Sequence, residues 1–368
     1  MDVRVWRSMD PLIVAAVGGL LLLGITLIYS ASATGEWARG PLVDHPAFRQ
    51  AIYALVGALA LVLMLLLDYR LLGRVAPLIY GLTLLALLLV DVTGQVSYGA
   101  KRWITLPFLQ FQPSELAKVG LIITLAKFFA DREGSSHLLR SLLLSLALAL
   151  PPIALVFFQP DVGTMLVLIA IWLGMALMSG IPLRYFAGVG LIALLLLPVV
   201  YEFGLHDYQR ARIEEFLDPS RDPLGRSYNI IQAEISIGSG GLFGKGLMSG
   251  SQTQLNYLRV QTTDFIFSVL GEELGFFGGL LLLGLFTLLL LRAIQAAERA
   301  RDSFGRLLVV GVCIMILVQT TINIGVNTRL LPATGVPLPF ISAGGTSLIA
   351  LMTAIGIVES VAARRGRG

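Results

Sequence analysis

The chain has 368 residues, of which 56% are hydrophobic and only 14% are charged, and its formal net charge is +4. This composition excludes an ordinary soluble domain and indicates a protein embedded in a membrane. The single cysteine, Cys313, excludes an intramolecular disulfide, and the three histidines lack metal-ligand spacing. The Lys and Arg residues are unequally distributed between the loops on the two sides of the membrane. The positive net charge is explained by this distribution and does not indicate a nucleic-acid partner.

Ten apolar stretches are long enough to cross a bilayer, which takes roughly 20 residues in a helix. The stretch that begins at Glu115 is the shortest, and it starts with charged residues. The sequence therefore predicts an all-α polytopic membrane protein, with about ten transmembrane helices in a single integral-membrane domain over residues 1–368. The expected spans are Pro11–Tyr29, Ala51–Leu67, Val75–Val90, Glu115–Phe129, Leu138–Phe157, Gly163–Met178, Pro182–Tyr201, Phe267–Leu291, Leu307–Val326 and Ile341–Val361.

A long polar insert, Glu202–Phe265, separates the seventh span from the eighth. An even number of spans puts both ends of the chain on one side. The loops of that side hold 15 Lys and Arg residues, against 5 in the short loops of the other side. By the positive-inside rule, both termini are cytoplasmic and the insert, residues 202–265, is a large extracytoplasmic loop.

The first polar cluster on the outer side surrounds the start of the fourth span. Pro113 and Ser114 are helix-start signals, and Glu115 and Lys118 are three residues apart, so they share one helix face. Lys118 either snorkels towards the membrane surface or forms a paired, inward-facing ionisable site with a carboxylate, Glu115 or Asp264.

Two further segments of the outer side carry charge. A short turn between the fifth and sixth spans contains Asp161, which is either a solvated turn residue or part of a site. In the insert, residues 227–237 predict one amphipathic helix, and a glycine-rich run, residues 238–246, follows it. That run fails the phosphate-loop pattern at Ser239 and Gly246, so we expect a flexible turn there.

The eighth span begins with polar residues. Thr262 or Thr263 can cap a helix that starts at Asp264, and Ser268 and Glu272 would then continue a polar stripe along the same face. The alternative is an acidic residue stabilised by the helix dipole. Before the last span, prolines and glycines in residues 335–347 predict a re-entrant or broken segment.

Taken together and in order, these segments resemble the SEDS family of bacterial cell-wall proteins, the RodA/FtsW group, from about Leu12 to Ala362. The stretch from Gly250 to Leu255, GSQTQL, is similar to the RodA branch, which serves cell elongation and rod shape. One departure is clear. Where the family commonly has proline, glutamate and histidine before its aspartate, this chain has Arg259, Val260 and Thr262. The resemblance therefore carries over Asp264, but no role of that glutamate or histidine.

The resemblance implies a peptidoglycan glycosyltransferase, an inverting hexosyltransferase of the bacterial cytoplasmic membrane. Its substrate would be lipid II, a disaccharide-pentapeptide on undecaprenyl pyrophosphate, which it would polymerise into β-1,4-linked glycan strands. The implied partner is a class B penicillin-binding protein, a transpeptidase, and the apolar spans would contact membrane lipid.

The chemistry needs a base for the attacking sugar hydroxyl and stabilisation of the anionic leaving group. Asp264 is the predicted base. Positive charge for the pyrophosphate would come from Lys118 and Arg102, with Lys101 and Arg212; Glu115, Asp161, Ser268 and Glu272 complete the predicted substrate-binding set. Alternatively, the carboxylates of Glu115, Asp161 and Asp264 hold a divalent cation, Mg or Mn, against the pyrophosphate. No organic cofactor is expected.

Two other functions remain open at this stage. A lipid II flippase would suit ten spans with charges inside the membrane, although a carrier should have a midplane site accessible from both sides, whereas these charges fall towards the outer face. A non-catalytic scaffold for the transpeptidase would not require the Asp264 and Lys118 set.

Overall fold

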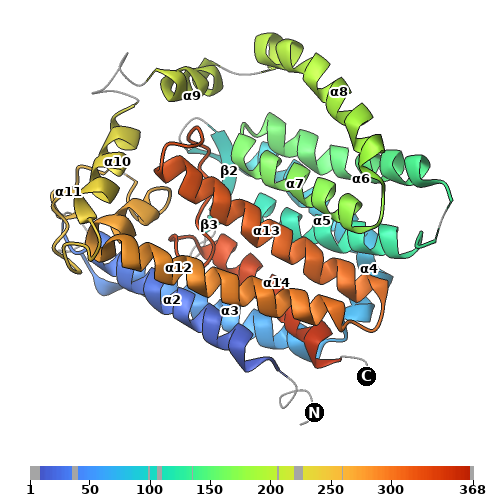
Figure 1. The fold of residues 1–368 in the computed structure, drawn as a ribbon, viewed down its shortest axis with the longest axis horizontal. Helices are drawn as coiled ribbons and strands as arrows, with labels where there is room; N and C mark the ends of the chain where they lie inside the picture. The colour runs from blue at the N-terminus through green and yellow to red at the C-terminus, as the bar shows by residue number, and fades with distance from the viewer. Residues whose placement is uncertain are drawn as a thin grey trace.

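The computed structural model describes residues 9–34, 40–97, 100–105, 110–134, 136–204, 207–218, 227–258 and 260–364. Long helices dominate and pack side by side into one bundle (Figure 1). Ten of them coincide with the ten predicted spans: α2 (Pro11–Ala31), α3 (Pro46–Leu66), α4 (Tyr69–Thr93), α5 (Pro113–Ala130), α6 (Leu138–Phe158), α7 (Val162–Met178), α8 (Leu183–Val199), α12 (Ile266–Glu298), α13 (Ser303–Asn327) and α14 (Gly345–Ala363).

Within the described residues, seven helices are long and apolar enough to cross a membrane, namely α2, α3, α4, α6, α12, α13 and α14. The helix α7 is apolar but shorter, and α5 carries three charged residues. The chain is therefore a polytopic, mostly helical membrane protein, and the count of ten spans stays a prediction.

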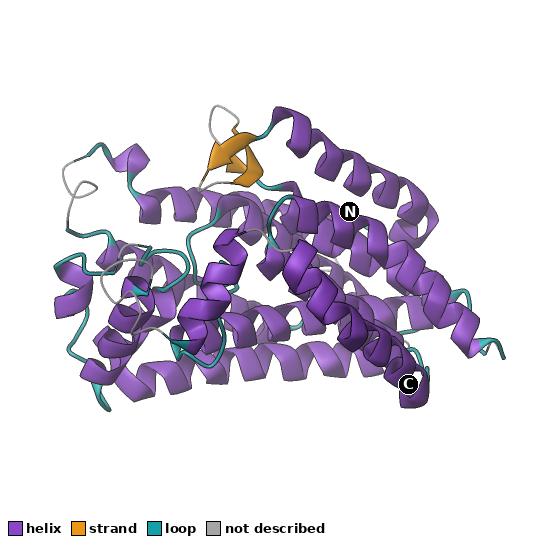
Figure 2. Ribbon diagram, turned by 90° about the horizontal axis from the view of Figure 1, so that it is seen from above, coloured by secondary structure: helices purple, strands orange, loops and turns teal. Residues whose placement is uncertain are grey.

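The fold is mostly helical, as predicted, but it also contains a small sheet that the sequence did not indicate. Residues near the expected loop at Lys101 form a small antiparallel sheet of three strands: β1 (Gln95–Ser97), β2 (Ala100–Thr105) and β3 (Gln110–Phe111). Figure 2 shows this sheet at the edge of the helical bundle. Strand pairing satisfies backbone groups in the connection between α4 and α5, where no helix pairs them.

The insert between α8 and α12 contains helices rather than one irregular loop. A π-helical turn (Val200–Gly204) is followed by α9 (Asp207–Leu217), α10 (Tyr228–Gly240) and α11 (Ser251–Gln254). The helix predicted over residues 227–237 is confirmed, and it extends into the glycine-rich run. A short 3-10 helix (Leu42–Asp44) precedes α3.

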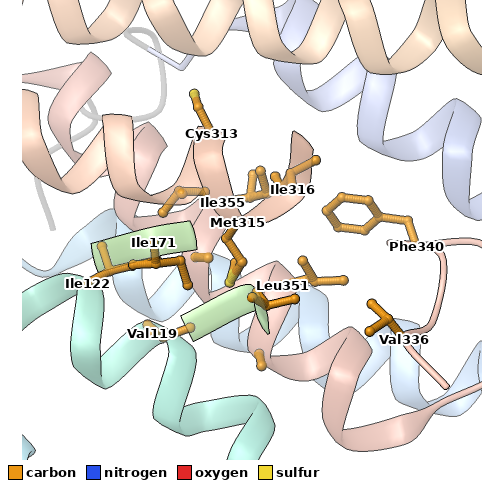
Figure 3. Close-up of a cluster of buried hydrophobic side chains, with 14 of the residues drawn as sticks. Val119, Ile122, Ile171, Cys313, Met315, Ile316, Val336, Phe340, Leu351 and Ile355 are labelled. Atoms are coloured by element: carbon orange, nitrogen blue, oxygen red, sulfur yellow. The ribbon is translucent and has the colours of Figure 1, made fainter. Parts of the chain in front are cut away.

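The predicted break before the last span is confirmed. The backbone is non-helical from Leu331 to Gly344, so α14 begins at Gly345 rather than at Ile341. Val336 and Phe340 of this segment point into the apolar core between α5, α13 and α14 (Figure 3). Non-helical backbone is tolerated within such a bundle because protein, not lipid, surrounds it.

Small residues allow close contact between the helices. A Cβ on Gly356 of α14 would lie 2.6 Å from the backbone oxygen of Leu61 in α3. A Cβ on Gly311 of α13 would lie 2.6 Å from the side chain of Ile122 in α5. Such contacts are typical of helices packed in membranes, and they join α14 closely to α3 and α13 closely to α5.

Candidate active site

Asp264 lies in the turn that immediately precedes α12. The helix begins at Ile266, and its N-cap residue Phe265 makes no side-chain capping bond, so the predicted helix start at Asp264 is wrong. The backbone oxygen of Asp264 instead accepts hydrogen bonds from Nδ2 of Asn323 (3.2 Å) and Nδ2 of Asn327 (2.9 Å). These two amides on α13 hold the turn in place and leave the Asp264 carboxylate available.

The segment before α14 holds the same turn from the other side. The Ser342 hydroxyl donates to the backbone oxygen of Thr263 (2.6 Å), and the Ala343 N–H donates to that of Thr262 (2.9 Å). Gly335 lies opposite Asp264, with a φ of 75° that favours glycine, and a Cβ there would lie 3.8 Å from Asp264 Oδ2. The broken segment therefore forms one wall of the site.

Three charged side chains act on the Asp264 carboxylate. Enclosure by protein raises the pKa of Asp264 above the ordinary value for an aspartate, and the negative charge of Asp161 acts in the same direction. The guanidinium groups of Arg212 and Arg102 and a hydrogen bond with Thr263 oppose that rise. The site thus combines a carboxylate of raised basicity with two permanent positive charges.

Asp161 is a buried side chain, 5% exposed, so it is not a solvated turn residue. It caps α7 through the N–H and the hydroxyl of Thr164 (3.2 and 3.0 Å), and Nε2 of Gln112 donates to it (3.3 Å). Arg102 approaches it from β2, with 3.9 Å between Nη1 and Oδ1. The same guanidinium donates to the backbone oxygens of Gln159 (3.2 Å) and Pro160.

Arg212 reaches the site from α9 in the insert. Its Nη1 donates to the backbone oxygen of Ala333 in the broken segment (3.1 Å). The backbone of Lys101 lies in β2, but its side chain falls outside the described part of the chain. Segments far apart in sequence therefore bring Arg102, Asp161, Arg212 and Asp264 together.

Lys118 and Glu115 form a buried ion pair one turn into α5. The Nζ of Lys118 lies 2.8 Å from each carboxylate oxygen of Glu115, and the two side chains are 2% and 3% exposed. The predicted paired, inward-facing site is confirmed with Glu115 as the partner, and the snorkelling alternative is wrong. A contact of either residue with a substrate stays a prediction.

Ser268 and Glu272 take part in packing contacts. The Ser268 hydroxyl donates to Oδ1 of Asn327 (2.6 Å). The Glu272 carboxylate, fully buried, accepts from Nζ of Lys245 (2.8 Å) and from the N–H and hydroxyl of Thr253 (3.0 and 2.8 Å). Glu272 therefore binds the insert to α12, and its role towards a substrate stays a prediction.

The three carboxylates proposed for a cation are not gathered in one place. Among the described residues, no group of three His, Cys, Asp or Glu side chains could hold a metal ion. Glu115 is occupied by Lys118, so only Asp161 and Asp264 remain close to one another.

Sequence reasoning missed Asn323 and Asn327. Their signal was available: two amide side chains four residues apart near the end of an apolar helix share one face, and polar groups within spans are costly unless they are paired. Glu273, the neighbour of Glu272 in the polar start of the eighth span, was left out of the predicted substrate-binding set; its carboxylate accepts from the Ser30 hydroxyl (2.6 Å).

The comparisons with known proteins agree over nearly the whole chain. The family model for FtsW, RodA and SpoVE, described as cell cycle protein, matches residues 11–366. The peptidoglycan glycosyltransferase MrdB of Escherichia coli K12 is 38% identical over 357 residues, which cover 97% of this chain and 94% of that protein.

Two solved structures are similar throughout. A chain from a study of how a peptidoglycan synthase complex coordinates polymerization and crosslinking superposes with a TM-score of 0.81, at 36% identity and with 98% of this chain and 99% of that one covered. The rod shape determining protein RodA of Thermus thermophilus gives a TM-score of 0.72 at 34% identity, with 99% of both chains covered.

Proposed function

The chain belongs to the FtsW, RodA and SpoVE family, and we propose that Asp264 is the general base of its peptidoglycan glycosyltransferase reaction. The observation that supports this role is the position of its carboxylate, in a turn held by α13 and facing Gly335, within electrostatic reach of Arg102 and Arg212. Enclosure there raises the pKa of the carboxylate. A base whose pKa lies closer to the working pH transfers protons more effectively than an ordinary aspartate. Asn323 and Asn327 hold its backbone, so the carboxylate is positioned before the substrate arrives.

In the proposed reaction, Asp264 accepts the proton of a sugar 4-hydroxyl while that oxygen attacks the anomeric carbon of a second substrate. A β-1,4 glycosidic bond forms, the bond from that carbon to the pyrophosphate oxygen breaks, and the lipid pyrophosphate leaves with the bonding electrons. Attack from the face opposite the leaving group inverts the anomeric centre, so a single carboxylate base is sufficient. We take the substrate to be lipid II.

The leaving pyrophosphate requires positive charge, which Arg102 and Arg212 can supply because both act electrostatically on Asp264. As an alternative to the base role of Asp264, Asp161 and Asp264 would be the protein ligands of a divalent cation, which would supply positive charge to neutralise the leaving group. Glu115 cannot join them without breaking its pair with Lys118.

Replacement of the base tests the proposal directly. Asp264→Asn keeps the size of the side chain but removes proton acceptance, so we expect glycan synthesis from lipid II to fall by about 10²–10⁴-fold. The assay uses purified protein, with its transpeptidase partner, in detergent, and glycan chains are resolved on a gel. Because detergent removes any need for transport, loss of polymer there also separates an enzyme from a flippase.

Glu214→Gln is a matched control, because Glu214 is an exposed carboxylate on α9 of the same insert. It should polymerise lipid II at the parental rate. A near-parental rate for Asp264→Asn would make the assignment wrong, and Asp161 would then be the next candidate.

We also propose ten spans, with both termini in the cytoplasm and the insert outside, in the bacterial inner membrane. The bias of 15 Lys and Arg residues against 5 supports this orientation. A reporter fused after Arg301 should read as cytoplasmic and one near Arg221 as external. The reverse result would place Asp264 on the wrong side for cell-wall synthesis.

The proposed partner is a class B penicillin-binding protein, and the proposed role is elongation. A similar chain comes from a peptidoglycan synthase complex that couples polymerization to crosslinking, which supports such a partner. Co-purification of a tagged chain with the transpeptidase from its own membranes tests the pairing. Depletion of the chain should produce round cells if it serves elongation and filaments if it serves division.

A further inference from the structure

Exposed aromatic side chains gather where the insert meets α12. Phe243, in the loop after α10, is 78% exposed, and Phe276 and Phe277 of α12 are 61% and 49% exposed. The ring centroids of Phe243 and Phe277 are 5.1 Å apart, and those of Phe276 and Phe277 are 6.0 Å apart. Leu242 adds a fourth apolar side chain, 62% exposed. A patch of this kind on a protein surface marks contact with a partner or a lipid.

The patch has a rigid base, because backbone hydrogen bonds tie the loop to a break in α12. Gly275 has a φ of 64° and a ψ of −158°, which interrupts the helix. The N–H groups of Phe276 and Phe277 then donate to the oxygens of Gly241 and Leu242 (2.9 and 3.1 Å).

A second pair of bonds closes the loop from its other end. The N–H groups of Lys245 and Gly246 donate to the oxygens of Glu272 and Glu273, at 3.0 Å in each case. Gly244 has a φ of 76°, and a Cβ there would lie 2.1 Å from the Glu273 oxygen. The glycine-rich run is thus held against the backbone of α12, which corrects the expectation of a flexible turn, and its geometry directs Phe243 outwards.

The length of α2 and the contacts of its last turn give the depth of the patch in the membrane. Its 21 residues make a helix of about 31 Å, which matches the hydrocarbon thickness of about 30 Å. Ser30, at its last turn, donates to Glu273 Oε1 (2.6 Å) and accepts from the Met248 N–H (3.1 Å). Glu273 and the loop therefore lie near the limit of the hydrocarbon, and Phe276 and Phe277 follow on the side of the membrane span.

We propose that the loop from Gly241 to Leu247 is a membrane-interface anchor, with Leu242 and Phe243 inserted among the lipids of the leaflet on the side of the insert. The occupant is lipid because the patch continues into exposed apolar residues of α12, Leu280 and Leu281, which are 54% and 55% exposed. Aromatic residues favour this depth, where an apolar body meets the headgroup region. The anchor would fix the height of this part of the insert in the membrane, together with the bonds that join it to Glu272 of α12.

Depth-dependent fluorescence quenching tests the anchor on the chain alone, in lipid nanodiscs. In a Cys313→Ala background, an NBD fluorophore is attached to Phe243→Cys, and separately to Leu242→Cys in case the first position disturbs folding. Ser239→Cys is the matched control, because Ser239 is exposed and polar at the end of α10. Quenchers are lipids with a doxyl group near the headgroup or near the chain end, and aqueous iodide.

The anchor predicts loss of fluorescence at positions 242 and 243 with the headgroup-proximal doxyl lipid, weaker loss with the chain-end doxyl lipid, and protection from iodide. Position 239 should show the reverse, with strong iodide quenching. Iodide quenching at 242 and 243 equal to that at 239 would overturn the proposal. So would protection from both iodide and doxyl lipid, since a second copy of the chain would then cover the patch.

Discussion

The buried pair of Lys118 and Glu115 offers a test that separates folding from chemistry. Both side chains are almost inaccessible, and each carboxylate oxygen is 2.8 Å from the ammonium nitrogen. Lys118→Met keeps much of the apolar stem but removes the charge. The Glu115 carboxylate is then left in the bundle without its partner.

The size of the effect follows from desolvation. Removal of one member of a buried ion pair costs about 3–5 kcal/mol, because the other charge stays buried and uncompensated. Replacement of both members by well-packed hydrophobic residues of similar volume is often neutral or stabilising by about 1–4 kcal/mol. The double variant Glu115→Leu with Lys118→Met should therefore regain the stability that Lys118→Met loses.

The double variant should regain stability, but it should not regain polymerisation of lipid II. The pair follows Gln112 by about one turn of α5, and the Gln112 amide donates to Asp161 in the site (3.3 Å). We predict that the Lys118 charge contributes to binding of the pyrophosphate. The assays are thermal unfolding in detergent and the gel assay with lipid II, on the parent, the single variant and the double variant. If the double variant polymerises at the parental rate, the pair only stabilises the fold. If Lys118→Met unfolds at the parental temperature, the burial argument itself fails.

Three further changes have expected outcomes. Only the unprotonated Asp264 can accept a proton, so kcat/KM should rise as the pH passes its raised pKa. Asp161→Asn removes a negative charge that raises this pKa, so the rise in kcat/KM should move to lower pH. A move to higher pH would contradict the electrostatics. Gly275→Ala places a Cβ 2.3 Å from a backbone nitrogen of the insert, at a φ of 64°. It should therefore destabilise the fold by more than about 1 kcal/mol. Gly279→Ala is the control: it has open space around it and should not lower the unfolding temperature. Asn327→Leu removes a donor and an acceptor from buried partners and should cost about 1–3 kcal/mol together with a loss of polymerisation; an unchanged rate would show that the turn holds without it.

The positions of the helices were predictable because each span must hide its backbone polar groups by itself. That requirement is local, so apolar runs in sequence located all ten long helices. The Lys118–Glu115 pair was predictable for the same reason, since a spacing of three residues on one helix needs no tertiary information. The β hairpin around Lys101 was not, because pairing between its strands competes with an irregular loop of the same composition.

Contacts between distant segments could not be read from the sequence. Arg212 reaches the site from a helix of the insert and donates to the backbone oxygen of Ala333 in the segment before α14. Another part of the insert is bound to α12 by the Glu272 bonds to Thr253 and Lys245, just before the break at Gly275, which falls inside a run that reads as one continuous span. Two adjacent glutamates before that glycine were the visible signal, because two fully buried carboxylates in an apolar helix require partners from elsewhere.

The misplaced start of α12 has a chemical consequence. At the first position of the helix, as the sequence suggested, the dipole would stabilise the ionised carboxylate of Asp264 and weaken it as a base. In the structure, Asp264 precedes the first residue of the helix by two positions. Its backbone oxygen accepts the hydrogen bonds that hold the turn, and burial raises the pKa of its carboxylate. The amides of Asn323 and Asn327 therefore do more than fill α13: by bonding the backbone rather than the carboxylate, they fix the position of the base without satisfying the oxygens that must receive the proton.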